Sequence, residues 1–115
     1  MSYGKSVLQE ITPLGRELRK AIPDTYAGFS ALLQGAMSDG VLDVKTKELI
    51  ALAIGVSKQC DGCIAAHARG AAKAGATREE VAEALGVAVL MNGGPATVYG
   101  PRALEAFDEF AGEAG

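Results

Sequence analysis

The chain has 115 residues, of which 49% are hydrophobic and 22% are charged, and these values are typical of a globular protein rather than a disordered one. The length favours a single domain that occupies residues 1–115. The formal net charge of −3 argues against a nucleic-acid partner, because binding to phosphates requires a basic surface.

The sequence contains no pattern typical of a membrane or secreted protein. The longest unbroken apolar run covers the eight residues 49–56, whereas a membrane helix needs about 20 residues. No apolar stretch follows Lys5, as a secretory signal would require. We therefore expect a cytoplasmic protein without a membrane partner.

Small residues dominate the composition. Alanine and glycine, with 21 and 15 residues, make up nearly a third of the chain, and tryptophan is absent. Small side chains let helices pack closely, but each of them buries little apolar area. We therefore expect the chain to gain stability by forming a homo-oligomer.

Helix start and stop residues are frequent along the chain, and no run alternates between apolar and polar residues for long enough to predict a strand. Thr12 and Pro13 predict a helix over about 13–21, with Thr12 as its N-cap. Pro23 predicts the start of a second helix, which ends near Asp39-Gly40.

The middle of the chain predicts two more helices. Asp43 is the expected N-cap of a third helix over about 44–58. A fourth helix is expected over about 60–74, because Gly75 suits the end of a helix.

The last part of the chain is also predicted to be helical. Thr77 and Glu80 fit a capping box, which opens a fifth helix that extends to about Met91. After a short Gly/Pro-rich break, a last helical stretch runs to about Phe110, and Pro101 is expected to start or kink it. The sequence therefore predicts an all-α fold of five or six helices.

The most informative residues are Cys60, Cys63 and His67. On a helix of about 100° per residue, all three side chains share one face, and Cys63 and His67 are neighbours one turn apart. A thiol attacks peroxides and disulfides as the thiolate, which a helix N-terminus and an adjacent histidine both favour. Two cysteines at this spacing can also close a disulfide on each other, so the pattern indicates dithiol redox chemistry.

Two other interpretations of the cysteines stay open. Lone cysteines are often buried as small apolar residues, although two of them on one face beside a histidine rarely arise for that reason alone. Cys60, Cys63 and His67 also supply three possible zinc ligands, with Glu48 as a possible fourth. Structural zinc sites usually have four Cys or His ligands, and the chain has no second cysteine pair.

Glu48 is the fourth candidate site residue. It lies twelve residues before Cys60, which is about one helix and a turn, so its carboxylate can face the helix that carries the cysteines. A partly buried carboxylate can orient an imidazole and accept a proton. His67 is the single histidine of the chain, so it is the imidazole for such a pair.

This spacing of Glu48, Cys60, Cys63 and His67 resembles that of the AhpD-like alkylhydroperoxidases of the carboxymuconolactone decarboxylase family. The similarity extends through Lys47–Gly55 before the motif and Ala71–Val81 after it, and it covers a core at about residues 20–110. It implies an all-α AhpD-like fold that assembles as a homotrimer or homohexamer.

The resemblance also implies a thiol-dependent peroxidase or disulfide oxidoreductase. Glu48 and His67 would form a proton relay, Cys63 would attack a small-molecule hydroperoxide, and Cys60 would resolve the product as a disulfide. Cys60 is expected to be the more exposed cysteine and to exchange with a thiol or dihydrolipoamide-type reductant. Since thioredoxin-like dithiols use their first cysteine as the nucleophile, the reverse assignment stays open. No cofactor and no resident metal are expected.

One departure separates this chain from the Cys-Ser-His-Cys form of the motif, because Asp61 and Gly62 lie between the cysteines and the inner histidine is missing. Asp61 suits the helix dipole but disfavours a nearby thiolate. Two alternatives therefore remain: a carboxymuconolactone decarboxylase-like enzyme, for which Lys58 and Arg69 are the nearby cations, and a non-enzymatic dithiol redox sensor.

Overall fold

The structure is a computed structural model that describes residues 2–114. The expected all-α fold is confirmed, since these residues form six helices and no strand. The helices are α1 (Lys5–Ala21), α2 (Pro23–Met37), α3 (Val44–Ser57), α4 (Asp61–Lys73), α5 (Arg78–Asn92) and α6 (Gly94–Ala114).

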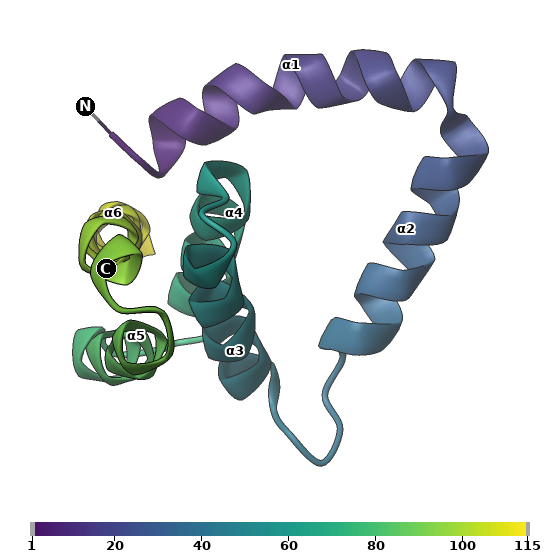
Figure 1. Ribbon diagram of the computed structural model, residues 1–115. Coiled ribbons are helices and arrows are strands. Elements are labelled where there is room, and N and C mark those ends of the chain that lie inside the picture. The colour runs from purple at the N-terminus through teal and green to yellow at the C-terminus, as the bar shows by residue number, and fades with distance from the viewer. Residues whose placement is uncertain (1, 115) are drawn as a thin grey trace.

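The last four helices form a bundle that contains the hydrophobic core (Figure 1). Within this bundle, α4 packs against α3 and α6, and α5 packs against the same two helices. The largest fully buried side chains come from three of the helices and are Leu52, Val56, Ile64 and Val81. The helix that carries the cysteines therefore lies at the centre of the packed part of the molecule.

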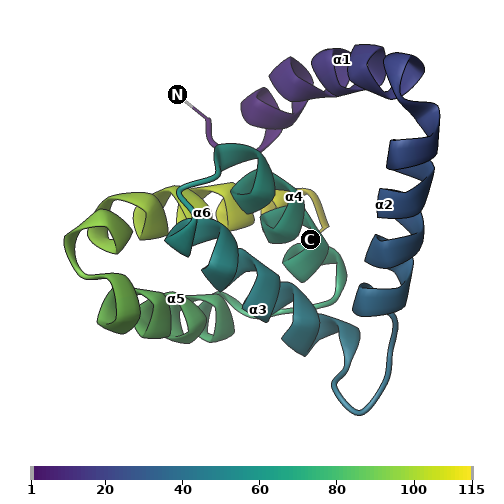
Figure 2. The same cartoon turned by 45° about the vertical axis from the view of Figure 1, so that its right-hand side comes forward.

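The first two helices, which we call the arm, are arranged differently. They meet at a bend near Ile22, and α2 runs down alongside the bundle in both views (Figures 1 and 2), where it contacts α3. Neither arm helix has a buried residue, and large apolar side chains such as Leu14, Phe29 and Leu32 are at least 60% exposed. The arm therefore adds little to the core of its own chain.

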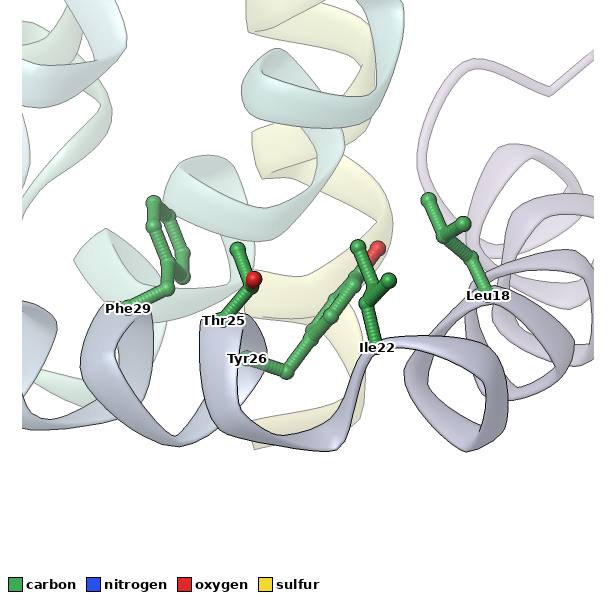
Figure 3. A pocket seen from close by; sticks show the side chains of 5 residues that line it. All are labelled: Leu18, Ile22, Thr25, Tyr26 and Phe29. Atoms are coloured by element: carbon green, nitrogen blue, oxygen red, sulfur yellow. The ribbon is translucent and has the colours of Figure 1, made fainter.

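The inner side of the bend has a hollow of about 340 Å³ (Figure 3). Side chains of both arm helices line it, namely Leu18, Ile22, Thr25, Tyr26 and Phe29. Its walls are almost entirely apolar, and neither the cysteines nor His67 contributes to them. This hollow is part of the apolar surface of the arm rather than of the candidate site.

The predicted start of the first helix is wrong. The helix α1 begins at Lys5, so that Pro13 lies inside it and the Thr12 hydroxyl donates to the Leu8 carbonyl at 2.6 Å instead of capping a helix. The Glu109 carboxylate on α6 accepts from the backbone N–H groups of Gly4 and Lys5, each at 3.1 Å. This distant carboxylate caps α1. Pro13 has no N–H group to donate to the carbonyl four residues earlier in the helix, but Pro13 is exposed, so water can bind that carbonyl instead.

The last helix also begins earlier than expected. It starts at Gly94 and continues through Pro101, so Pro101 does not start it. The break before it consists of Gly93 alone, whose φ of +70° ends α5 in a conformation that glycine adopts without strain. By contrast, the expected Asp43 cap and the Thr77/Glu80 capping box are both present.

Candidate functional site

The two cysteines lie at the N-terminus of α4. Cys60 is the N-cap residue, and its sulfur accepts a hydrogen bond from the backbone N–H of Cys63 at 3.2 Å. The two residues form a disulfide, and their Cα atoms are 5.3 Å apart. Because the N-terminal end of a helix carries partial positive charge, it favours the thiolate form of both cysteines when the disulfide is reduced.

The exposure of the two cysteines differs from the expectation. Cys63 is exposed and Cys60 is half-buried, so the expectation that Cys60 is the more accessible residue is wrong. Cys60 lies in the corner between two helices, where its backbone N–H donates to the Gly55 carbonyl of α3 at 3.1 Å. Cys63 lies in the first turn of α4 and is more exposed to solvent. Cys63 is therefore the more exposed residue of the pair.

Gly55 allows α3 to approach the cysteine pair closely. A Cβ atom at this position would lie only 3.3 Å from the Cβ of Cys63. That separation is tight for a carbon–carbon contact, so a larger residue would push the two helices apart. The close packing of α3 on α4 also brings Glu48, two turns before Gly55 on α3, within reach of His67.

Glu48 and His67 are brought together across the same helix pair. The Oε1 atom of Glu48 on α3 lies 2.7 Å from Nδ1 of His67 on α4. Glu48 is buried, with 8% of its surface exposed, and His67 is half-buried. An ionised carboxylate only accepts hydrogen bonds, so with Glu48 ionised Nδ1 is the donor, and in a neutral imidazole Nε2 is then the nitrogen that can accept a proton.

Gly70 makes room for the Glu48 carboxylate. A Cβ atom on Gly70 would overlap this carboxylate, which rests against the backbone of α4. Sequence reasoning missed this residue, although a glycine in the middle of a helix costs about 1 kcal/mol relative to alanine and so signals a local need. Gly70 therefore belongs to the site as the residue that seats Glu48.

A hollow of about 310 Å³ lies beside the Glu48–His67 pair. Leu33 and Met37 at the end of α2 supply part of its apolar wall, and Arg69 lies at its edge with Lys73. Neither cysteine lines this hollow. Glu48 and His67 thus line a surface depression to which the disulfide does not contribute.

Asp61, which lies between the cysteines in the sequence, binds Arg102 of α6. The Nη1 atom of Arg102 lies 3.1 and 3.2 Å from the two carboxylate oxygens of Asp61. The guanidinium group also lies over the rings of Tyr99 and Tyr3, at 4.3 and 4.7 Å from their centroids. Sequence reasoning missed Arg102, because nothing local links it to a motif about forty residues away.

Residues 2–114 contain no group of three or more His, Cys, Asp or Glu side chains that could hold a metal ion. The three ligands considered for zinc are therefore not assembled around one point in this part of the chain. No helix within the same residues is both long and apolar enough to cross a membrane.

The comparison with known proteins agrees with the motif. The sequence model of the carboxymuconolactone decarboxylase family matches residues 23–109. An uncharacterised protein from Cupriavidus necator is 39% identical over 104 residues, which cover 90% of this chain and 92% of that protein. An uncharacterised protein from Haemophilus influenzae is 50% identical over 91 residues, or 79% and 80% of the two chains.

Two solved structures are similar to this fold. A carboxymuconolactone decarboxylase family protein from Legionella pneumophila is 50% identical and superimposes with a TM-score of 0.89 over 93% of this chain and 96% of that one. A chain from Burkholderia xenovorans, at 24% identity and a TM-score of 0.78 over 85% and 77% of the two chains, shows the fold alone. The protein therefore belongs to the carboxymuconolactone decarboxylase family, the AhpD-like family that the spacing of Glu48, Cys60, Cys63 and His67 predicts.

Proposed function

We propose that this protein is a thiol-dependent peroxidase that reduces organic hydroperoxides and is itself reduced by an external dithiol. One observation carries the proposal. A disulfide between Cys60 and Cys63 lies at a helix N-terminus, one turn from His67, which binds the buried carboxylate of Glu48.

In the first step, the Cys63 thiolate attacks the terminal oxygen of the hydroperoxide. The O–O bond breaks, the cysteine becomes a sulfenic acid, and the alcohol leaves after taking up one proton. The Cys60 thiol then attacks the sulfenic sulfur, so that a disulfide forms and water leaves. Together the two steps oxidise the dithiol by two electrons and reduce the hydroperoxide by two electrons.

The Glu48–His67 pair supplies the proton transfers of this cycle. With Nδ1 held by Glu48, the Nε2 atom of His67 can accept a proton from a thiol and return it to the leaving oxygen. Cys63 is the natural partner, because residues four apart on a helix are neighbours. We therefore keep Cys63 as the attacking cysteine, and its exposure also suits access by peroxide.

Reduction of the disulfide requires a thiol or a dihydrolipoamide-type dithiol, in which two thiols become a disulfide while Cys60 and Cys63 take up the electrons. The exposed Cys63 sulfur is the accessible point of attack, and Cys60 then leaves as a thiolate. The N–H group of Cys63 that donates to Cys60 stabilises this leaving group. The cytoplasm provides a reducing environment for such a cycle.

We further infer that the chain works as a homotrimer or homohexamer. The exposed apolar side chains of the arm support this, because a monomer in water rarely leaves so much apolar surface uncovered. A second copy of the chain is a suitable cover for that surface.

The direct test is turnover of an organic hydroperoxide with a dithiol reductant. Cys60→Ser and Cys63→Ser should each abolish catalytic turnover, a loss of at least about a hundredfold, because neither can complete the dithiol–disulfide cycle. Consumption of peroxide at the wild-type rate by the double variant would contradict the proposal. Rapid oxidation of the wild type that no reductant reverses would favour a redox sensor, and loss of carbon dioxide from a lactone acid by the double serine variant would favour a decarboxylase.

A further inference from the structure

Asp61 carries a negative charge next to the cysteine pair, and Arg102 compensates this charge through an ion pair. Asp61 directly follows Cys60 and is the first residue of α4, where a carboxylate is favourable for the helix dipole. The same negative charge, however, opposes ionisation of the neighbouring thiol. Without a partner, Asp61 would work against the chemistry that the helix N-terminus promotes.

Arg102 reaches this carboxylate from α6 and also contacts two aromatic rings. Its Nη1 atom contacts both oxygens of Asp61, at 3.1 and 3.2 Å, while Tyr3 and Tyr99 stack on its guanidinium group. The Arg102 side chain is 26% exposed and that of Asp61 is 40% exposed, so water screens the pair only in part. Two aromatic rings and a carboxylate thus fix one guanidinium group at the start of α4.

We propose that Arg102 is a positioning residue that neutralises Asp61 and thereby keeps the thiol of Cys60 acidic enough to leave during reduction of the disulfide. The inference takes its importance from the proposed dithiol cycle, in which Cys60 is the leaving thiolate. A thiol of lower pKa leaves faster in thiol–disulfide exchange. Arg102 therefore acts through Asp61 and needs no contact with the peroxide.

Other titratable groups on the neighbouring elements must also be kept in a test. Lys58 carries an ammonium group in the turn before the motif. Glu48 and His67 form the pair across α3 and α4. Tyr3 and Tyr99 supply the phenol rings that contact Arg102. On the arm, α1 contributes the apolar side chain of Ile11 next to Gly62. Asp61→Asn leaves all of these groups in place, whereas Arg102→Gln also removes the cation on which Tyr3 and Tyr99 stack, so the two substitutions are compared with each other.

The test is a thiolate titration by ultraviolet absorbance in the Cys63→Ser background, where Cys60 is the single thiol. Arg102→Gln should raise the pKa of Cys60 by about 0.3 to 1 unit, which lowers its thiolate fraction about two- to tenfold below the pKa. Asp61→Asn should lower the pKa by a similar amount, since the positive charge of Arg102 then stands alone. The double variant should fall between the two single variants.

Two control variants separate charge from structure. Arg78→Gln breaks another Arg–Asp ion pair, with Asp108 of α6, and should leave the pKa of Cys60 unchanged. Arg102→Lys keeps the charge and should retain a pKa between those of the parent and Arg102→Gln. If loss of helix packing were the cause, Asp61→Asn and Arg102→Gln would shift the pKa in the same direction, and that result would overturn the proposal.

An unchanged pKa in a folded Arg102→Gln variant would also overturn the proposal. The titration uses no peroxide and no reductant, so its outcome is independent of the peroxidase assay. Opposite shifts in a protein that does not turn over peroxide would contradict the proposed function and leave the role of Arg102 intact.

Discussion

The arm and the bundle of this chain are both helical, but they are stabilised in different ways. In the bundle, α3, α4 and α5 each begin with a residue whose side chain accepts a backbone N–H, namely Asp43, Cys60 and Thr77. In the arm, neither N-cap residue supplies such a bond, and neither helix buries a residue. The comparison teaches that sequence patterns can predict a helix in either region, whereas the hydrophobic core of the chain lies in the bundle.

The functional residues follow this division. All four candidate site residues lie on or immediately before α3 and α4, where close packing fixes one helix against the other. The arm instead covers an edge of the site, with Ile11 next to Gly62 and Leu33 beside the hollow at His67. The candidate site is thus built on the well-packed part of the molecule, whereas the arm exposes most of its apolar side chains.

The largest effect on stability is expected for Leu52→Ala in the bundle. Leu52 is fully buried, so its truncation removes apolar contacts and leaves a cavity that costs about 2–5 kcal/mol of unfolding free energy. Chemical denaturation followed by circular dichroism measures this cost. A loss of unfolding free energy below about 1 kcal/mol would show that the bundle core repacks around the missing side chain. The difference in packing between the bundle and the arm would then be smaller than proposed.

Gly70→Ala is expected to have the next largest effect, with a destabilisation of about 1–3 kcal/mol. The new Cβ would overlap the Glu48 carboxylate and force it away from His67, which outweighs the better helix propensity of alanine. Gly86→Ala on α5 is the matched control, since a Cβ there meets nothing within 4 Å and should stabilise the helix by up to about 1 kcal/mol. Equal stabilisation by both substitutions would show that Glu48 does not need the space left by the missing side chain of Gly70.

Leu32→Ala in the arm should change the unfolding free energy of the dilute protein by less than about 0.5 kcal/mol. Leu32 is 65% exposed within its own chain, so little packing is lost there, but truncation should weaken self-association. Light scattering of the wild type should give a trimer or a multiple of it, with a shift to smaller mass in the variant. A monomeric wild type at micromolar concentration would contradict the assignment of the arm to an interface.

The smallest effect is expected for Glu80→Gln at the start of α5. The backbone N–H of Thr77 and the Lys45 ammonium group bind the carboxylate and hold the pKa of Glu80 below its ordinary value of 4.5. A lowered pKa in the folded state adds stability above the unfolded pKa, and this stability is lost as pH falls through the folded value. Wild type should therefore melt above the variant at pH 7, and the gap should narrow as the pH falls below 4.5 and through the lowered folded pKa of Glu80. A gap that does not depend on pH would rule out the ionised capping box as its source.

Much of the fold could be predicted because its signals are local. The cap residues Asp43 and Thr77 and the stop at Gly75, whose φ is +84°, lie next to the helices they delimit. The start of α1 could not be predicted, because Glu109 supplies its cap from about a hundred residues away. The same difference between local and distant contacts applies to the site: the cysteine motif could be read from the sequence, but the residues that pack against it could not.

Within the site, spacing along α4 indicated that Cys60, Cys63 and His67 share a face, but it could not give their exposure. That property depends on the corner that α3 makes with α4, where Cys60 is half-buried. The seat at Gly70 and the partner of Asp61 likewise depend on which helices pack together. A single sequence holds no periodic or spacing signal for such contacts.

The central claim is that Cys60 and Cys63 form a redox-active pair, and a thiol count tests it most directly. Fully reduced protein is treated with one equivalent of an organic hydroperoxide, free thiols are counted before and after, and the product is mapped by mass spectrometry. We expect two thiols to disappear into an intramolecular disulfide between Cys60 and Cys63. Two thiols that remain free while the peroxide persists would contradict the account.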